Sequence, residues 1–88
     1  MQERFKEIIA TAQAAAKEKQ QLKILYEKSD GSKKWRIVSP YSYKAQYENC
    51  GGILFAEQDG HIKSFAVDKI LEIEILPAKF KPKWKIEF

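Results

Sequence analysis

The chain has 88 residues, of which 44% are hydrophobic and 32% are charged, and this composition is typical of a soluble globular domain. A chain of this length buries a single core, so we expect one domain and exclude a second folded unit. Its longest apolar run is far shorter than the ~18 residues that span a bilayer, and the N-terminus lacks the apolar core of a signal peptide. We therefore expect a cytoplasmic protein with no membrane partner.

Cysteine and histidine are too scarce for disulfide or metal chemistry. Cys50 is the one cysteine, so it cannot form an internal disulfide, and we expect it to be a half-buried packing residue. A structural zinc site needs four ligands, whereas this chain offers one cysteine and one histidine, His61. We expect no metal and no cofactor.

Positive charge is concentrated in two segments that also carry aromatic residues. The chain has 16 basic and 12 acidic residues, and its net charge of +4 favours an anionic partner. Residues 33–36 read Lys-Lys-Trp-Arg, and residues 79–85 alternate lysine with Phe, Pro and Trp. This mixture suits a phosphate backbone with a stackable base, but it equally suits solvated strand faces on which lysine guards an edge.

Residues 1–20 are predicted to form a leading helix. This stretch has no Gly or Pro and is rich in Ala and long unbranched side chains. Apolar residues recur at helical spacing, namely Phe5, Ile8, Ile9, Ala12, Ala15 and Ala16. The small alanines permit close approach to a neighbour, and we favour the domain's own sheet over a partner helix.

Two strands are predicted next, over residues 21–27 and 34–39, with turn residues between them. Pro40 has no amide hydrogen for a ladder, so it should end the second strand or place it at a sheet edge. The tyrosine-rich stretch 41–51 is then predicted to be a long connection, and long ordered loops often carry function. The alternative for Tyr43 is that its ring caps the core.

A hairpin follows, with strands at 53–56 and 62–66 and with Asp59-Gly60 in the tight turn. Residues 67–70 are too short for a helix of their own, and residues 71–76 alternate apolar with acidic residues as a fifth strand. Five short strands after one helix predict a mainly β, α+β fold, a small, strongly bent barrel over residues 21–76 whose closure removes the sheet edges. The tail, residues 77–88, is either a sixth strand or an arm that docks on another subunit.

Several of these segments together resemble a WYL domain. The resemblance runs from about residue 14 to residue 80 and is most specific at residues 63–70, where the family has an arginine, an aromatic two residues later, and then an aspartate followed by arginine and isoleucine. Lys63, Phe65, Asp68 and Lys69 stand at these positions. The family's Trp-Tyr-Leu triplet aligns with residues 52–54, Gly-Ile-Leu, so only the leucine matches.

The resemblance implies an Sm-like, SH3-type barrel with a leading helix, in agreement with the strand count. WYL domains are regarded as ligand-sensing modules that bind nucleic acid or nucleotide-type ligands. They occur in bacterial transcription regulators and phage-defence proteins, usually behind a winged-helix DNA-binding domain. This chain has no such domain, so it is either a piece of a larger regulator or a small binding protein of a phage or mobile element.

The expected function is therefore regulatory binding of an anionic ligand, a nucleic acid or nucleotide, through a basic and aromatic groove. Lys63 and Phe65 share one strand face, opposite Ser64, so charge and ring can line one groove. Asp68 is expected to be a local cap or ion-pair partner. The candidate ligand-binding residues are Lys63, Lys69, Phe65, Arg36, Lys44, Tyr41 and Tyr43.

Two other functions are weighed against ligand binding. Catalysis is not expected, because no Ser or Cys is paired with His61, and the Gly51-Gly52 pair precedes a strand rather than the helix of a phosphate loop. The alternative function is protein–protein interaction or oligomerisation, including a homodimer, through the leading helix and the tail.

Overall fold

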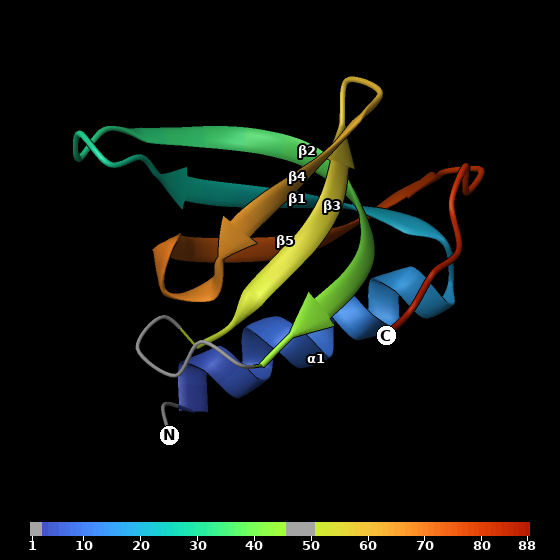
Figure 1. Cartoon of the computed structure of the whole chain (residues 1–88), viewed down its shortest axis with the longest axis horizontal. Helices are drawn as coiled ribbons and strands as arrows, with labels where there is room; N and C mark the ends of the chain where they lie inside the picture. The colour runs from blue at the N-terminus through green and yellow to red at the C-terminus, as the bar shows by residue number, and fades with distance from the viewer. Residues whose placement is uncertain (1–2, 46–50) are drawn as a thin grey trace.

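Helix α1 (Glu3–Lys17) leads into a five-stranded antiparallel sheet with the strand order β4-β3-β2-β1-β5 (Figure 1). The structure is a computed structural model that describes residues 3–45 and 51–88. The strands are β1 (Gln20–Glu27), β2 (Lys33–Lys44), β3 (Ile53–Gln58), β4 (His61–Ala66) and β5 (Ile70–Lys79), and the 3-10 turn η2 (Val67–Lys69) joins β4 to β5. The predicted mainly β, α+β barrel-like fold is confirmed.

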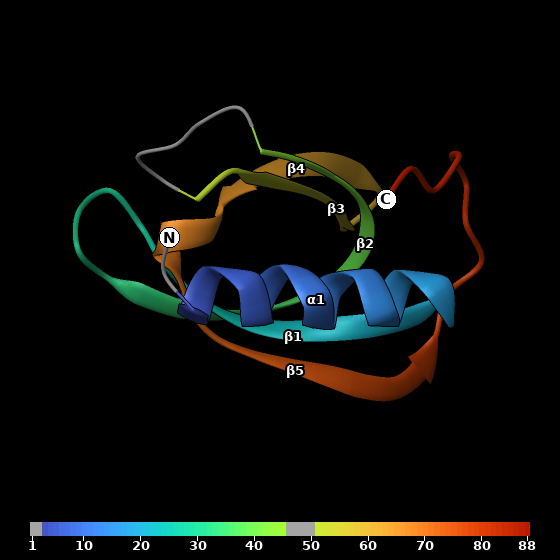
Figure 2. The same ribbon diagram turned by 90° about the horizontal axis from the view of Figure 1, so that it is seen from below.

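Helix α1 packs on the chain's own sheet, alongside β1 (Figure 2). Its buried positions are Ile8, Ala12, Ala15 and Ala16, which follow the predicted helical spacing. Three of these four side chains are methyl groups, so the helix axis can lie close to the strands beneath it. The apolar side of helix α1 is thus buried against the chain's own sheet.

Strand β2 departs most from the sequence prediction, because it runs straight through Pro40. The proline is fully buried and pairs with Ala56 of β3, in the middle of the sheet order and not at an edge. The β1 ladder has already ended at the pair Leu22 and Val38, and a register shift follows between Pro40 and Ser42. Proline is tolerated here because it sits beside a bulge, where β2 bends away from β1 toward β3.

As a consequence, Tyr41 and Tyr43 belong to β2 and not to a long loop, which corrects that prediction. Residues 45–52 connect β2 to β3, and Cys50 lies outside the described residues. Strand β2 therefore pairs with β1 through its first half and with β3 through its second half.

The β3–β4 hairpin is confirmed. Gln58 and His61 are the last pair of the ladder, and the turn residues Asp59 and Gly60 have φ of 55° and 85°. Two successive positive φ values are those of a hairpin turn whose twist matches the strands. The stretch after the hairpin differs from the prediction, since Val67–Lys69 does form one helical turn, of the 3-10 type, before β5.

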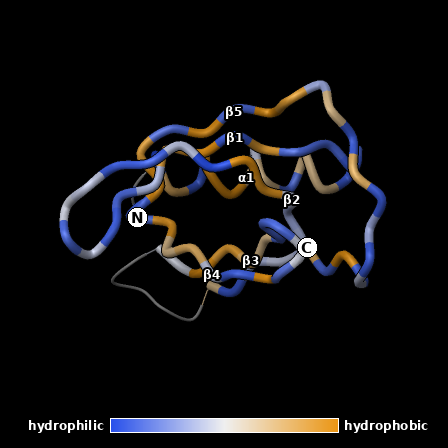
Figure 3. The backbone as a smooth tube through the Cα atoms, turned by 90° about the horizontal axis from the view of Figure 1, so that it is seen from above, coloured by the Kyte–Doolittle hydropathy of each residue, from blue (hydrophilic) through white to orange (hydrophobic). Residues whose placement is uncertain are grey.

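The core lies between α1 and the concave side of the bent sheet. Apolar and polar positions alternate along β1 and β5 (Figure 3). Strands β4 and β5 are the two edges of the sheet. Among the described strands, these edges are connected by η2 and not by a hydrogen-bonded ladder, so the barrel closure that we predicted is incomplete. The buried side chains include Leu22, Ile24, Val38, Leu54, Phe65, Val67 and Ile70.

The tail folds back on its own chain rather than forming a complete sixth strand. A single parallel bridge joins Glu87 to Ser42, and the Glu87 amide donates to the Tyr41 carbonyl oxygen at 2.8 Å. Within the described residues, no helix has the length and apolar character needed to cross a membrane.

Gly52 provides a test of the β2–β3 junction. Its φ is +103°, and a Cβ there would lie 2.5 Å from the Tyr43 ring and 2.6 Å from the Lys44 carbonyl oxygen. Gly31 has a similar φ of +89°, with nothing within 4 Å of its Cβ position. We expect Gly31→Ala to lower the free energy of unfolding by about 1 kcal/mol and Gly52→Ala by about 3 kcal/mol, because the second adds a clash with backbone.

Urea unfolding of the two variants measures this difference. Equal destabilisation would mean that the close approach at Gly52 does not exist in solution.

The β1–β2 turn makes the folding free energy pH-dependent. Asp30 Oδ1 accepts hydrogen bonds from the Ser32 amide at 2.9 Å and the Ser32 hydroxyl at 2.7 Å, and these bonds lower the pKa of the Asp30 carboxyl. A carboxyl whose pKa is lower in the folded state contributes stability above its unfolded pKa and loses it as the pH falls through its folded pKa. We expect the stability gap between wild type and Asp30→Ala to be present at neutral pH and to shrink in acid.

Thermal unfolding of wild type and Asp30→Ala at a series of pH values measures this difference in stability. Ser32→Ala keeps the backbone bond and should show a smaller acid dependence, whereas a gap that is constant with pH would contradict the role of the carboxylate.

Candidate ligand-binding site

The candidate site is centred on Arg36, whose side chain lies half-buried against two aromatic rings. Its guanidinium carbon is 5.8 Å from the centroid of the Tyr26 ring and 5.9 Å from that of the Phe65 ring. The two rings meet edge to face, with centroids 5.1 Å apart and an interplanar angle of 83°. Both cation–π contacts hold the guanidinium in place on the concave side of the sheet.

The hydrogen bonds of Arg36 are incomplete in this position. Its Nη1 donates to Gln58 Oε1 at 3.0 Å, from the end of β3. Its Nε is buried and has no hydrogen-bond partner among the described residues. An unmet buried donor costs about 1–3 kcal/mol, so an acceptor oxygen that reached this nitrogen would remove that cost.

The two rings are held by the backbone of other strands. The Tyr26 hydroxyl accepts a hydrogen bond from the Ala66 amide at 3.1 Å, at the junction of β4 and η2. Tyr26 also pairs with Ile70 of β5, and Phe65, which is buried, pairs with Leu54 of β3. The site is thus assembled from residues of β1, β2, β3 and β4.

Lys63 lies on the same face of β4 as Phe65, two residues nearer the hairpin turn. It pairs with buried Ala56, and its own side chain is exposed. The structure therefore brings Arg36 and Phe65 into contact and adds Lys63 at the exposed end of the same face. Tyr26 and Gln58 were not among the predicted site residues, since nothing local in the sequence indicates that β4 folds over β1.

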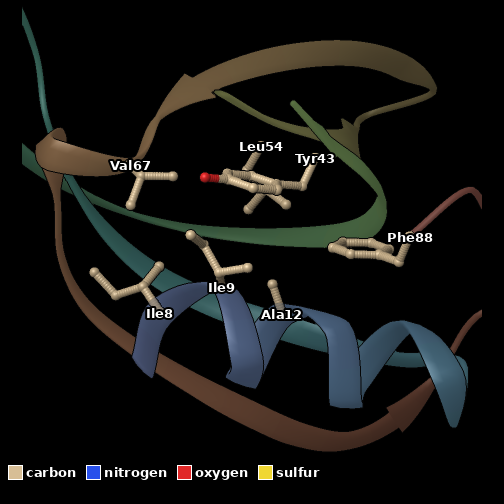
Figure 4. A pocket seen from close by; sticks show the side chains of 7 residues that line it. All are labelled: Ile8, Ile9, Ala12, Tyr43, Leu54, Val67 and Phe88. Carbon is tan, nitrogen blue, oxygen red and sulfur yellow. The ribbon is translucent and has the colours of Figure 1, made fainter. Parts of the chain in front are cut away.

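Lys44 and Tyr43 lie away from this cluster. Lys44 is on the opposite face of the sheet, where its Nζ is 6.0 Å from the Phe55 ring centroid. The Tyr43 hydroxyl donates to the Gly51 carbonyl oxygen at 2.7 Å, and its ring lies over helix α1 (Figure 4).

Tyr43 also lines an apolar gap in the core, which has no room for a water molecule and is therefore a packing feature. The residues around the gap, shown in Figure 4, are Ile8, Ile9, Ala12, Tyr43, Leu54, Val67 and Phe88.

Tyr41 is covered by the tail and is only 3% exposed. The rings of Phe80 and Trp84 each lie 5.6 Å from the Tyr41 ring, and its hydroxyl accepts a hydrogen bond from the Lys83 amide at 3.0 Å. A base can stack on Tyr41 only if the tail leaves.

Asp68 and Lys69 belong to η2, and both are half-buried. Ala66 occupies the N-cap position of η2 without a side-chain cap bond, and Asp68 Oδ1 is buried with no hydrogen-bond partner among the described residues. Asp68 therefore does not act as the predicted local cap through its Oδ1 atom. The described residues contain no cluster of three or more His, Cys, Asp or Glu side chains that could hold a metal ion.

Comparison with known proteins agrees with the resemblance noted in the sequence. The family model of the WYL domain matches residues 7–75, more than three quarters of the chain. The match includes Tyr26, Arg36, Gln58, Lys63 and Phe65, which we name the Arg36 cluster, and it stops before the tail. No curated protein matches the chain.

The Tyr26 hydroxyl can be tested as the support of the cluster. Tyr26→Phe leaves the Ala66 amide without its acceptor, so we expect a loss of about 1–2 kcal/mol of stability and faster hydrogen exchange at that amide. The Val67 amide, which donates to the Gly52 carbonyl oxygen at 3.0 Å, is the internal control and should keep its protection. Unchanged exchange at Ala66 in an NMR experiment would refute this support.

Proposed function

The chain belongs to the WYL domain family of regulatory, ligand-binding domains, and on that premise we propose that it binds an anionic ligand, a nucleic acid or nucleotide, at the Arg36 cluster. One observation carries the proposal: a guanidinium held against two rings and by Gln58 has a buried Nε with no hydrogen-bond partner among the described residues. A phosphate oxygen is the acceptor that such a donor binds best.

The side chains around Arg36 have separable roles in this proposal. Gln58 accepts from Nη1 and so fixes the orientation of the guanidinium. Tyr26 and Phe65 exclude water, which strengthens a charge-assisted hydrogen bond at that edge. Exposed Lys63 adds a second positive charge on a flexible stem and so tolerates different phosphate positions.

The cluster favours recognition of the phosphate over recognition of the base. Phe65 is buried, and its ring is engaged by Tyr26 and by the Arg36 guanidinium, so it offers no open face for stacking. The polar side chains here are Arg36, Gln58 and exposed Lys63, with the Tyr26 hydroxyl already bonded to the Ala66 amide, and these are too few to read a base edge as well as a phosphate. We therefore propose binding with little dependence on base identity.

In the cell, ligand binding would be the input of a regulator. We propose a non-catalytic sensing role in a bacterial or phage protein of transcription control or phage defence, with the output delivered by a separate DNA-binding domain. The site supports this role because phosphate binding would join side chains from four strands and so stabilise one arrangement of the sheet.

Substitutions of the cluster test the proposal. We expect Arg36→Gln to weaken binding of a fluorescein-labelled oligo-dT, and of a nucleoside monophosphate, by at least about tenfold. Lys63→Gln should weaken it by about threefold, because an exposed charge contributes less. Arg36→Lys should lose most of the affinity as well, since lysine keeps the charge without the planar fork. Fluorescence anisotropy and calorimetry at two salt concentrations measure these effects.

Lys44→Gln is the matched control, because it removes the same charge from the opposite face of the sheet. Thermal unfolding checks that each variant is folded. The proposed site would be refuted if folded Arg36→Gln bound with wild-type affinity, or if Lys44→Gln lost as much affinity as Arg36→Gln.

A further inference from the structure

The tail carries most of the chain's excess positive charge, and the proposed site does not use it. We name residues 79–88 the strap. Its side chains are four lysines and one glutamate, a net charge of +3 out of +4 for the whole chain. The strap also lies outside the residues that the family model matches. Without it the chain is close to neutral.

The strap alternates between apolar and basic positions. The odd-numbered residues from 79 to 85 are lysines, and all four are exposed. Apolar residues fill the even positions, and Phe80 and Ile86 are half-buried. An extended chain places alternate side chains on opposite sides, about 6.6–6.8 Å apart along one side. Phe80 and Ile86 thus face the body, whereas the four lysines are exposed to solvent together with Pro82, Trp84 and Phe88, and the strap bends at residues 83–84.

Tyr41 holds the strap on the body. Its ring contacts Phe80 and Trp84, its hydroxyl accepts from the Lys83 amide, and its carbonyl oxygen accepts from the Glu87 amide. These contacts fix the strap at four points, so its lysines are displayed on an ordered segment. A partner that binds them has less chain-ordering entropy to overcome than with a free tail.

Trp84 adds an aromatic surface to the row of lysines. Its ring meets Tyr41 edge to face, at 80°, and the side chain remains 44% exposed between Lys83 and Lys85. An exposed ring flanked by ammonium groups is the arrangement that receives an unpaired base together with its neighbouring phosphates. A duplex would keep its bases stacked and out of reach of this ring.

We propose that the strap is a second binding surface, for single-stranded nucleic acid, with its lysines on phosphates and Trp84 against a base. It is separate from the Arg36 cluster, because the strap contacts Tyr41, Ser42 and Lys19, and none of these residues belongs to that cluster.

The test compares two quadruple variants of equal net charge in binding to a fifteen-nucleotide oligo-dT. One variant replaces the four strap lysines, Lys79, Lys81, Lys83 and Lys85, with Gln. The other replaces four exposed lysines elsewhere, Lys6, Lys17, Lys28 and Lys44, with Gln. Each neutralised phosphate of a single strand contributes about 0.7 to the slope of log K against log salt, so the strap variant should lose up to about 3 from that slope. The control variant should keep it.

A second comparison uses the two tryptophans, which are similarly exposed, 44% for Trp84 and 46% for Trp35. We expect Trp84→Phe to lose most of the fluorescence quenching caused by oligo-dT, and Trp35→Phe to retain it. Equal salt slopes for the two quadruple variants, or quenching that survives in Trp84→Phe, would overturn the strap as a nucleic-acid surface. Equally tight binding of heparin or phosphatidylglycerol vesicles, independent of Trp84, would also overturn it.

Failure of the strap and failure of the Arg36 site are distinguishable. If Arg36→Gln abolishes oligonucleotide binding while the strap variant binds as wild type, the strap proposal is wrong and the Arg36 site stands. The reverse pattern supports the strap and refutes the site. Tyr41→Phe, which removes the acceptor of the Lys83 amide, should weaken strap-dependent binding and leave nucleoside monophosphate binding unchanged.

Discussion

The bend in β2 at Pro40 and Ser42 is the constraint on which the rest of the molecule depends. Because β2 leaves β1 after Val38 and continues along β3, one strand belongs to both halves of the sheet. The bend folds β3 and β4 over the concave side, which puts Phe65 against Arg36. The same bend leaves the backbone of Tyr41 open on the other side, where the strap docks. Both proposed surfaces thus follow from one irregularity in one strand.

The departure from the family triplet has a local explanation. Gly52 stands where the family has tryptophan, and in this structure any Cβ at Gly52 would collide with the Tyr43 ring and the Lys44 carbonyl oxygen. The Tyr43 side chain occupies this space and is bonded to Gly51. The space for a side chain at the first triplet position is therefore filled by internal packing, while the aromatic residue of the later segment, Phe65, lies against Arg36.

The two surfaces differ in the kind of binding they support. The Arg36 cluster holds one half-buried guanidinium against two aromatic rings, where a charge-assisted hydrogen bond is stronger than in solvent. The strap offers four exposed charges in solvent, where attraction is long-ranged, sensitive to salt and tolerant of ligand position. Under the two proposals, the strap would capture a polyanion and the Arg36 cluster would recognise a particular phosphate.

Local patterns in the sequence determined the elements, because their causes lie within a few residues. Helical spacing of alanines placed α1, two positive-φ residues placed the β3–β4 turn, and the WYL resemblance indicated the fold. Local sequence patterns gave wrong predictions at two places. Strand β2 continues through Pro40, because the proline lies beside a β-bulge where its missing amide hydrogen is tolerated. The 3-10 turn η2 is too short to show helical periodicity in the sequence. Only the tertiary structure decided that Arg36 meets Tyr26 and Phe65 and that the tail covers Tyr41. Those contacts join residues 10 to about 40 positions apart, and strand pairing and the bend, not local propensity, bring them together.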